Sequence, residues 1–254
     1  GTNLHNDYSD FVQGADDDKR VGQARATAQG WLTPFETCAA ATTTLSITLC
    51  SGVYLAHLTH QWDNLLYWIL VISSVFNAFA YTAGPYPLGY IGLGNCSIAY
   101  FGVADIFVFV YFGLVATWMP VFLEYLQGVS VDWNPIYGIQ VGLLAINIIV
   151  VNNLRDRLTD AKVGKKTTSV RFGGSFSIAQ YMTCVALSYG LVLVDYAATN
   201  DWRRLVPLLS LPLAISEIRA IVRKEGSDLN RHVGGAAKVQ LVFCILIAIG
   251  HRVL

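Results

Sequence analysis

The sequence predicts an all-α protein that crosses a membrane several times. Of its 254 residues, 54% are hydrophobic and only 13% carry a charge, whereas a soluble globular chain carries about 25% charged residues. The mean hydropathy is +0.47. The apolar runs are long and little interrupted, as transmembrane helices require. Because the formal net charge is zero, nothing in the overall charge indicates a nucleic-acid partner.

Seven apolar segments account for the predicted transmembrane bundle. In chain order they cover residues 34–58, 65–83, 98–123, 136–151, 176–194, 205–222 and 239–250. Asp105 interrupts the third segment, and the sixth contains two prolines with Glu217 and Arg219 near its end, which a bundle interior or a helix terminus tolerates. The seventh is short, so it needs residues 234–238 or the last residues of the chain to reach across the membrane.

The fourth segment leads directly into the most densely charged stretch of the chain, residues 151–173. If the helix continues through this junction, Asn152, Asp156 and Asp160 lie at i, i+4 and i+8 on one face. Such a row of oxygen ligands suits Mg²⁺, which binds one or two carboxylates and completes its shell with water and phosphate oxygens. Cations that could meet the same phosphates follow at Lys162, Lys165, Lys166 and Arg171.

A second acidic row at the N-terminus repeats this pattern. Asn6 and Asp10 have the same Asn-x-x-x-Asp spacing as Asn152 and Asp156, and Asp7 lies between them. Residues 16–18 are all aspartate and precede Lys19 and Arg20. The alternative interpretation is that each row caps a transmembrane helix and that the basic residues follow the positive-inside rule. Two carboxylate rows, each followed by cations, favour a diphosphate held between two metal sites.

The positions of the basic residues predict the topology. Four spans separate the two acidic rows, so both rows are expected on the same face of the membrane. The loops on that face carry 14 of the 17 Lys and Arg residues. This asymmetry predicts that both rows lie on the cytoplasmic or equivalent side.

These motifs resemble those of intramembrane prenyltransferases of the UbiA type, most closely the 1,4-dihydroxy-2-naphthoate prenyltransferases of menaquinone and phylloquinone synthesis. The resemblance covers essentially the whole chain. The residues that carry it are Asn3-x-x-Asn6-Asp7-Tyr8-x-Asp10-x-x-x-Gly14-x-Asp16, Arg20-Val21-Gly22, Asn152-Asn153-x-Arg155-Asp156-x-x-x-Asp160 and Gly164-Lys165-x-Thr167-x-x-Val170-Arg171-x-Gly173.

The resemblance implies a fold of nine helices around a central cavity, with the first acidic motif at the end of the second helix. Residues 1–254 would then form a single prenyltransferase domain that lacks the first span and most of the second. The protein would be an integral membrane protein, embedded in the lipid bilayer of a bacterial inner membrane or a plastid membrane.

The resemblance also implies a reaction, in which Mg²⁺ binds the diphosphate of a polyprenyl donor and an allylic cation forms as the diphosphate leaves. The aromatic ring of 1,4-dihydroxy-2-naphthoate attacks this cation, and its carboxylate leaves as carbon dioxide. The expected metal ligands are Asn6, Asp7, Asp10, Asp16, Asn152, Asp156 and Asp160. The expected diphosphate-binding residues are Asn3, Asn6, Lys19, Arg20, Asn153, Lys166 and Arg171. The residues expected to be catalytic are Asp10, Asp156, Asp160 and Lys165.

Two alternatives to this function stay open at the level of sequence. One is a related prenyltransferase whose acceptor is homogentisate, 4-hydroxybenzoate or a naphthoquinone, since Asn95 stands where an acidic residue commonly follows Leu-Gly in the family. The other is an ion-coupled transporter, although transporters typically carry their acids near the bilayer midplane rather than in basic loops.

Overall fold

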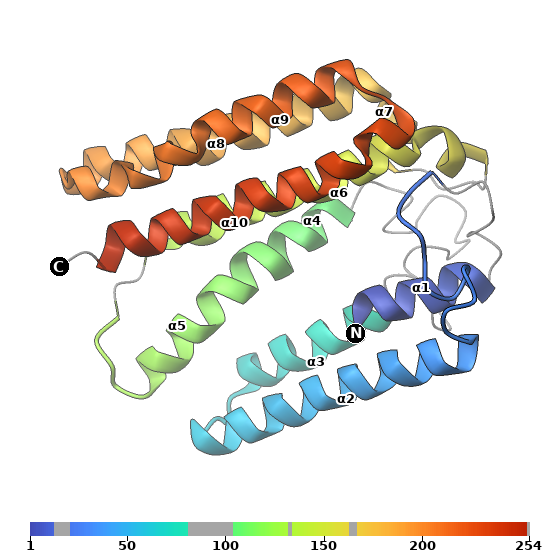
Figure 1. Cartoon of the computed structure of the whole chain (residues 1–254). Helices are drawn as coiled ribbons and strands as arrows, with labels where there is room; N and C mark the ends of the chain where they lie inside the picture. The colour runs from blue at the N-terminus through green and yellow to red at the C-terminus, as the bar shows by residue number, and fades with distance from the viewer. Residues whose placement is uncertain (13–20, 81–103, 132–133, 163–166, 253–254) are drawn as a thin grey trace.

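The computed structural model describes residues 1–12, 21–80, 104–131, 134–162 and 167–252. All regular elements in these ranges are helices, which confirms the predicted all-α class. The long helices run roughly along one common direction (Figure 1). Helices α1 (Thr2–Val12) and α6 (Pro135–Lys162) both end at the same end of the bundle, which we call the motif end. The opposite end, where the chain also terminates, is called the far end.

The long helical stretches alternate in direction along the chain, and some of them consist of two or three contiguous elements (Figure 1). After α1 and before α6 come α2 (Pro34–Leu58), α3 (Leu65–Ala80), α4 (Ala104–Val108), the π-helical stretch η1 (Phe109–Val115) and α5 (Ala116–Leu126). After α6 come α7 (Thr168–Phe172), α8 (Gly174–Thr199), the 3₁₀ helix η2 (Trp202–Ser210), α9 (Leu211–Arg223), the 3₁₀ helix η3 (Gly226–Leu229) and α10 (Asn230–Arg252).

The helices agree well with the predicted apolar segments. Six helical stretches are long and apolar enough to cross a bilayer, and a shorter apolar helix covers Leu65–Phe79. Residues 81–83 and 98–103 of the second and third segments lie outside the described ranges. The seventh segment is longer than predicted, because α10 already begins at Asn230. Residues 230–238, which include Asn230, Arg231, His232 and Lys238, therefore form the first turns of this helix.

Helix α2 begins where its sequence specifies a helix start. The Thr33 hydroxyl accepts from the backbone N–H of Glu36, and the Glu36 carboxylate accepts from the backbone N–H of Thr33, with Pro34 in the first turn. This reciprocal capping satisfies two backbone donors of the kind that helix starts leave open. Small side chains let α2 approach α3 closely, so that the Tyr67 hydroxyl donates to the Gly52 carbonyl.

The core of the protein surrounds α6. This helix packs against α8, η1 and α10, and it runs antiparallel to α8 (Figure 1). Their pairing is fixed by the Gln140 side-chain amide, which donates to the Ser188 carbonyl at 3.0 Å. Leu144, Val150 and Val151 of α6 are buried together with Phe243 of α10. Helix α6 thus has a rigid apolar half, from which its charged half extends.

Glycines bring η1 and α5 into direct contact with α6. A Cβ added to Gly113 would come within 2.8 Å of the Gly142 nitrogen and 2.9 Å of the Gly138 carbonyl oxygen. Gly138 and Gly142 are four residues apart, the spacing at which small residues allow close contact between membrane helices. This contact fixes the position of α4 and η1 against the centre of the bundle.

Candidate active site

The second acidic row lies on an uninterrupted helix. Helix α6 continues from the apolar core through the charged junction to Lys162, as the spacing of the row required. Asn152, Asp156 and Asp160 are therefore successive turns of one helix face, and all three are partly exposed. Asn153, expected to contact the diphosphate, is adjacent to this row but buried.

Arg155 completes this row in a way that spacing alone did not predict. Its guanidinium forms two hydrogen bonds to the Asp156 carboxylate, at 2.8 and 2.6 Å, and one to the Asn152 side-chain oxygen at 2.8 Å. The Arg155 side chain is 3% exposed and that of Asp156 is 13% exposed. A buried bidentate pair of this kind holds both side chains in defined positions. The signal was present in the sequence, because Arg155 is part of the Asn-Asn-x-Arg-Asp motif.

The first acidic row lies on α1. Asn6 and Asp10 are one helical turn apart, and Asp10 is buried. A guanidinium nitrogen of Arg25 lies 3.8 Å from the Asp10 carboxylate. Arg25 lies 15 positions after Asp10 in the sequence, and no helical pattern links the two residues. Asp10 and Asp156 are thus each accompanied by an arginine.

Asp7 makes different contacts from the other residues of its row. Its carboxylate accepts from the backbone N–H groups of Ala26 and Thr27, at 3.0 and 3.4 Å. These bonds hold the segment after the first motif against α1. Asn3 is exposed at the start of the same helix.

The short helix α7 follows the basic part of the second motif. The Thr167 hydroxyl accepts from the backbone N–H of Val170 and caps this helix, and the hydroxyls of Ser169 and Ser177 lie 2.7 Å apart where α7 contacts α8. Helix α7 also packs against α6. Arg171, one of the expected diphosphate-binding residues, is thereby held at the motif end.

The segments next to the two acidic rows contact adjoining elements at the motif end. The Asn230 side-chain amide at the start of α10 donates to the Val21 carbonyl at 2.9 Å, in the segment that follows the first motif. The adjoining η3 packs against α6, which carries the second motif. Helices α1 and α6, which carry the two rows, end at one end of the bundle (Figure 1), as the even number of spans between the rows predicted.

Five of the predicted site residues lie outside the described ranges: Asp16, Lys19, Arg20, Lys165 and Lys166.

The donor set at the motif end fits a hard cation that is only partly coordinated by protein. Within the described ranges, no three His, Cys, Asp or Glu side chains come close enough together to hold a metal ion by themselves. Mg²⁺ typically binds one or two carboxylates and takes its other ligands from water and phosphate. The partly exposed Asp156 carboxylate and the Asn152 amide oxygen fit such a site, provided that their unused lone pairs face the ion while Arg155 occupies the others.

Glu217, the carboxylate near the end of the sixth predicted segment, also has a hydrogen-bonding partner. Glu217 on α9 lies 2.7 Å from the Nδ1 atom of His232 on α10. The Nε2 atom of the same histidine lies 3.0 Å from the Lys224 ammonium. These contacts join α9 to α10 near the motif end and explain how this segment accommodates a carboxylate.

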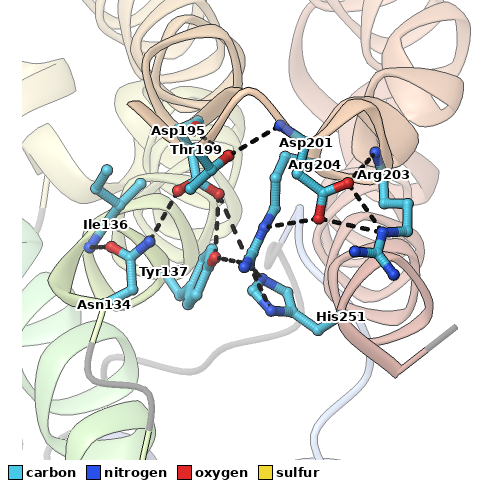
Figure 2. Close-up of polar contacts among 9 residues, drawn as sticks. All are labelled: Asn134, Ile136, Tyr137, Asp195, Thr199, Asp201, Arg203, Arg204 and His251. Atoms are coloured by element: carbon cyan, nitrogen blue, oxygen red, sulfur yellow. Dashed lines mark hydrogen bonds and ion pairs between the residues drawn. The ribbon is translucent and has the colours of Figure 1, made fainter. Parts of the chain in front are cut away.

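A separate polar cluster lies at the far end (Figure 2). We call it the far-end cluster; its charged or hydrogen-bonding side chains are Asn134, Tyr137, Asp195, Asp201, Arg203, Arg204 and His251. The Asp195 carboxylate accepts from Asn134 at 2.9 Å and from Tyr137 at 3.0 Å, and Arg204 lies 4.0 Å away. A hydrogen bond from Arg203 lowers the pKa of Asp201 below its usual value. This cluster joins the far ends of α6, α8, η2 and α10.

The fold defines a polytopic helical membrane protein that carries one acidic row on α1 and another on α6. Residues 1–239 match the UbiA prenyltransferase family, and the chain belongs to this family. It is thus a prenyltransferase and an integral membrane protein.

Individual relatives agree with this assignment. A 1,4-dihydroxy-2-naphthoate octaprenyltransferase of Mycobacterium tuberculosis is 34% identical over 218 residues, which are 85% of this chain and 67% of the relative. Proteins of the same name from Mycobacterium leprae and Escherichia coli are 31% and 30% identical. These matches cover 98% and 96% of this chain, respectively, and 78% of each relative.

Proposed function

We propose that this protein transfers a polyprenyl chain from its diphosphate to 1,4-dihydroxy-2-naphthoate with loss of carbon dioxide, a step of menaquinone or phylloquinone biosynthesis. The names of the relatives from M. tuberculosis, M. leprae and E. coli support this acceptor. The observation that carries the proposal is the continuity of α6, which extends without a break from the apolar core into the acidic row.

This continuity matters because the two ends of a polyprenyl diphosphate need opposite environments. The isoprenoid chain is apolar and would lie along the membrane-facing or interior helices, while its diphosphate needs cations. Helix α6 joins both environments in one continuous element: Val150 and Val151 are buried in the apolar core, and Asp156, a proposed ligand of the Mg²⁺ that would bind the diphosphate, follows less than two turns later. The allylic carbon would thus be held at the boundary between the two.

Five described residues of the two rows share one role in this proposal. Asn6, Asp10, Asn152, Asp156 and Asp160 would hold Mg²⁺. When bound, that ion would stabilise the negative charge that develops on the leaving diphosphate.

Three arginines would support the binding of the negatively charged diphosphate. Arg155 fixes the orientation of the Asp156 carboxylate, and Arg25 lies beside Asp10. Arg171 would bind the diphosphate directly. Preorganised cations of this kind stabilise charge without having to reorient during the reaction.

The acidic rows would lie on the cytoplasmic or equivalent face, and the asymmetry of the basic residues along the sequence supports this part of the proposal. A donor made in that compartment could then present its diphosphate to the motif end while its chain stays in the bilayer.

A transfer assay with purified full-length protein in detergent tests the function. We would supply Mg²⁺, radiolabelled polyprenyl diphosphates of different lengths and a panel of acceptors: 1,4-dihydroxy-2-naphthoate, homogentisate, 4-hydroxybenzoate and a naphthoquinone. We expect transfer to the first acceptor with release of its carboxylate as carbon dioxide. Preferential transfer to another member of the panel would replace the proposed acceptor.

The same assay tests the metal. EDTA should abolish the transfer, and Mg²⁺ or Mn²⁺ should restore it. Full turnover in the presence of the chelator would refute the metal-assisted mechanism.

A further inference from the structure

Asp105 is a buried carboxylate that the function described so far does not use. It lies in the first turn of α4 and is 6% exposed. One of its oxygens, Oδ2, accepts from the Gln180 side-chain amide of α8 at 2.7 Å and from the Thr168 hydroxyl of α7 at 3.4 Å. Within the described ranges, no cation lies within ion-pair distance of this carboxylate. An unpaired acid in a membrane-spanning helix is costly and usually functional.

The hydrogen bonds of this site are incomplete. The second oxygen of Asp105, Oδ1, is fully buried and has no donor among the residues that the structure describes. The side-chain oxygen of Gln180 is in the same condition. Two neighbouring acceptors therefore lack donors, although buried polar groups in proteins are nearly always hydrogen-bonded. The chemistry that is missing from the site is an O–H or N–H group.

The far-end cluster provides the contrast. Asp195 is buried as deeply as Asp105, at 4% exposure. Yet both of its oxygens accept hydrogen bonds, from Asn134 and Tyr137, and Arg204 supplies a positive charge (Figure 2). Asp195 thus has the complete set of partners of a structural carboxylate, whereas Asp105 does not.

The position of Asp105 relates it to the reaction. Helix α4 begins at the motif end (Figure 1) and packs against α6, which carries the second acidic row. Thr168, which donates to Asp105, opens the helix that follows the basic part of the second motif. Asp105 therefore lies inside the bundle, close to the elements that would hold the diphosphate.

We propose that Asp105 binds the aromatic acceptor, with Oδ1 accepting a hydrogen bond from a ring hydroxyl group. This inference rests on the proposed function, since it needs a hydroxylated aromatic acceptor. The hydrogen bond would orient the ring toward the allylic carbon. It would also raise the electron density of the ring, because a carboxylate draws the hydroxyl proton toward itself and leaves more negative charge on the ring oxygen.

The test compares Asp105→Asn with Asp195→Asn in the full-length protein. The Michaelis constants for acceptor and donor are measured separately, together with the melting temperature in detergent. For Asp105→Asn we expect kcat/KM for the acceptor to fall about 10- to 100-fold. This is the change that corresponds to the loss of one hydrogen bond to a charged group. The KM for the polyprenyl diphosphate and the Mg²⁺ requirement should stay the same.

The two variants should differ in melting temperature, which should fall only for Asp195→Asn. The amide introduced by Asp105→Asn can donate to the Gln180 oxygen, so the melting temperature should be unchanged or higher. Asp195→Asn removes the negative charge beside Arg204, so the melting temperature should fall while the KM for the acceptor stays normal. A purely structural Asp105 predicts a lower melting temperature for its variant and no selective effect on the acceptor.

A modified acceptor identifies the atom involved. A methyl ether of the acceptor cannot donate a hydrogen bond from the blocked oxygen. In the wild-type protein, kcat/KM for the ether should therefore be lower than kcat/KM for the hydroxyl compound. The factor should be about the same as that by which Asp105→Asn lowers kcat/KM for the hydroxyl compound. The variant should then lose little more when given the ether, because the same hydrogen bond has already been removed. Additive losses for every ether tested would overturn the proposal.

Other outcomes are equally decisive. Normal acceptor kinetics in Asp105→Asn would overturn the inference and leave the proposed function intact, whereas a wild-type protein that uses none of the hydroxylated acceptors would overturn both. If Asp105→Asn does not yield folded protein, Asp105→Glu keeps the charge and displaces it by one methylene. A normal KM for the acceptor in that variant would also overturn the inference.

Discussion

Replacing Asp156 by Ala should destabilise the protein as well as inactivate it. The reason is the neighbouring Arg155, whose side chain is 3% exposed and whose guanidinium makes two of its hydrogen bonds to this one carboxylate. Without Asp156 the guanidinium keeps only the Asn152 oxygen as a partner in the described structure. A positive charge would then remain buried and largely uncompensated.

The size of the effect follows from that burial. Breaking a buried ion pair by removing one partner costs about 3–5 kcal/mol. Asp156 itself is 13% exposed, so the lower end of this range applies. At roughly 2–4 °C per kcal/mol for a chain of this size, the melting temperature should fall by about 6–12 °C. Loss of the carboxylate should also slow transfer by about 100- to 1,000-fold, as for one preorganised electrostatic group.

A double variant separates the two effects. Replacing Arg155 by Leu in the Asp156→Ala background removes the uncompensated charge, so most of the lost melting temperature should return. Activity should not return, because the proposed metal ligand is still missing. The assay is a thermal melt in detergent combined with radiolabelled prenyl transfer on the same preparations.

The result that refutes this reasoning is a specific one. If Asp156→Ala melts like the wild type and transfers the prenyl group normally at low Mg²⁺, neither the ion pair nor the metal site has the assigned role. If the double variant recovers stability together with activity, Asp156 serves only to neutralise Arg155.

Four further variants test the packing of the helices and the charges at the two ends of the bundle. Gly113→Leu should lower the free energy of unfolding by roughly 1–3 kcal/mol or more, since the leucine side chain would collide with the backbone of α6. A thermal melt in detergent should show a melting temperature that is lower by several degrees. Gly190→Leu is the matched control and should melt normally, because a Cβ at Gly190 meets nothing within 4 Å. Lys165→Ala should reduce turnover while the melting temperature barely changes, and Arg203→Ala at the far end should leave turnover intact. A large loss of stability with normal turnover in Lys165→Ala would instead indicate a topological role for this lysine.

The sequence by itself determined the class of fold and the location of the two acidic rows. Continuous apolar segments of this length become helices in a bilayer, because a helix satisfies its backbone hydrogen bonds within the segment itself. The i, i+4 spacing of Asn152 and Asp156 then fixes their common face once the helix continues, as it does. The parity of the spans was likewise enough to predict that α1 and α6 end at the same end of the bundle.

Only the tertiary structure decided which polar side chains have partners. Asp105 and Asp195 are both acids within apolar segments, and no local pattern distinguishes them. Their difference arises from residues far away in the chain: Asn134, Tyr137 and Arg204 surround Asp195, whereas Asp105 meets Gln180 and Thr168 and keeps one oxygen without a donor. Helical periodicity gives the face of a residue on its own helix, but the neighbour on another helix depends on crossing angles and close approaches such as that of Gly113 and Gly142.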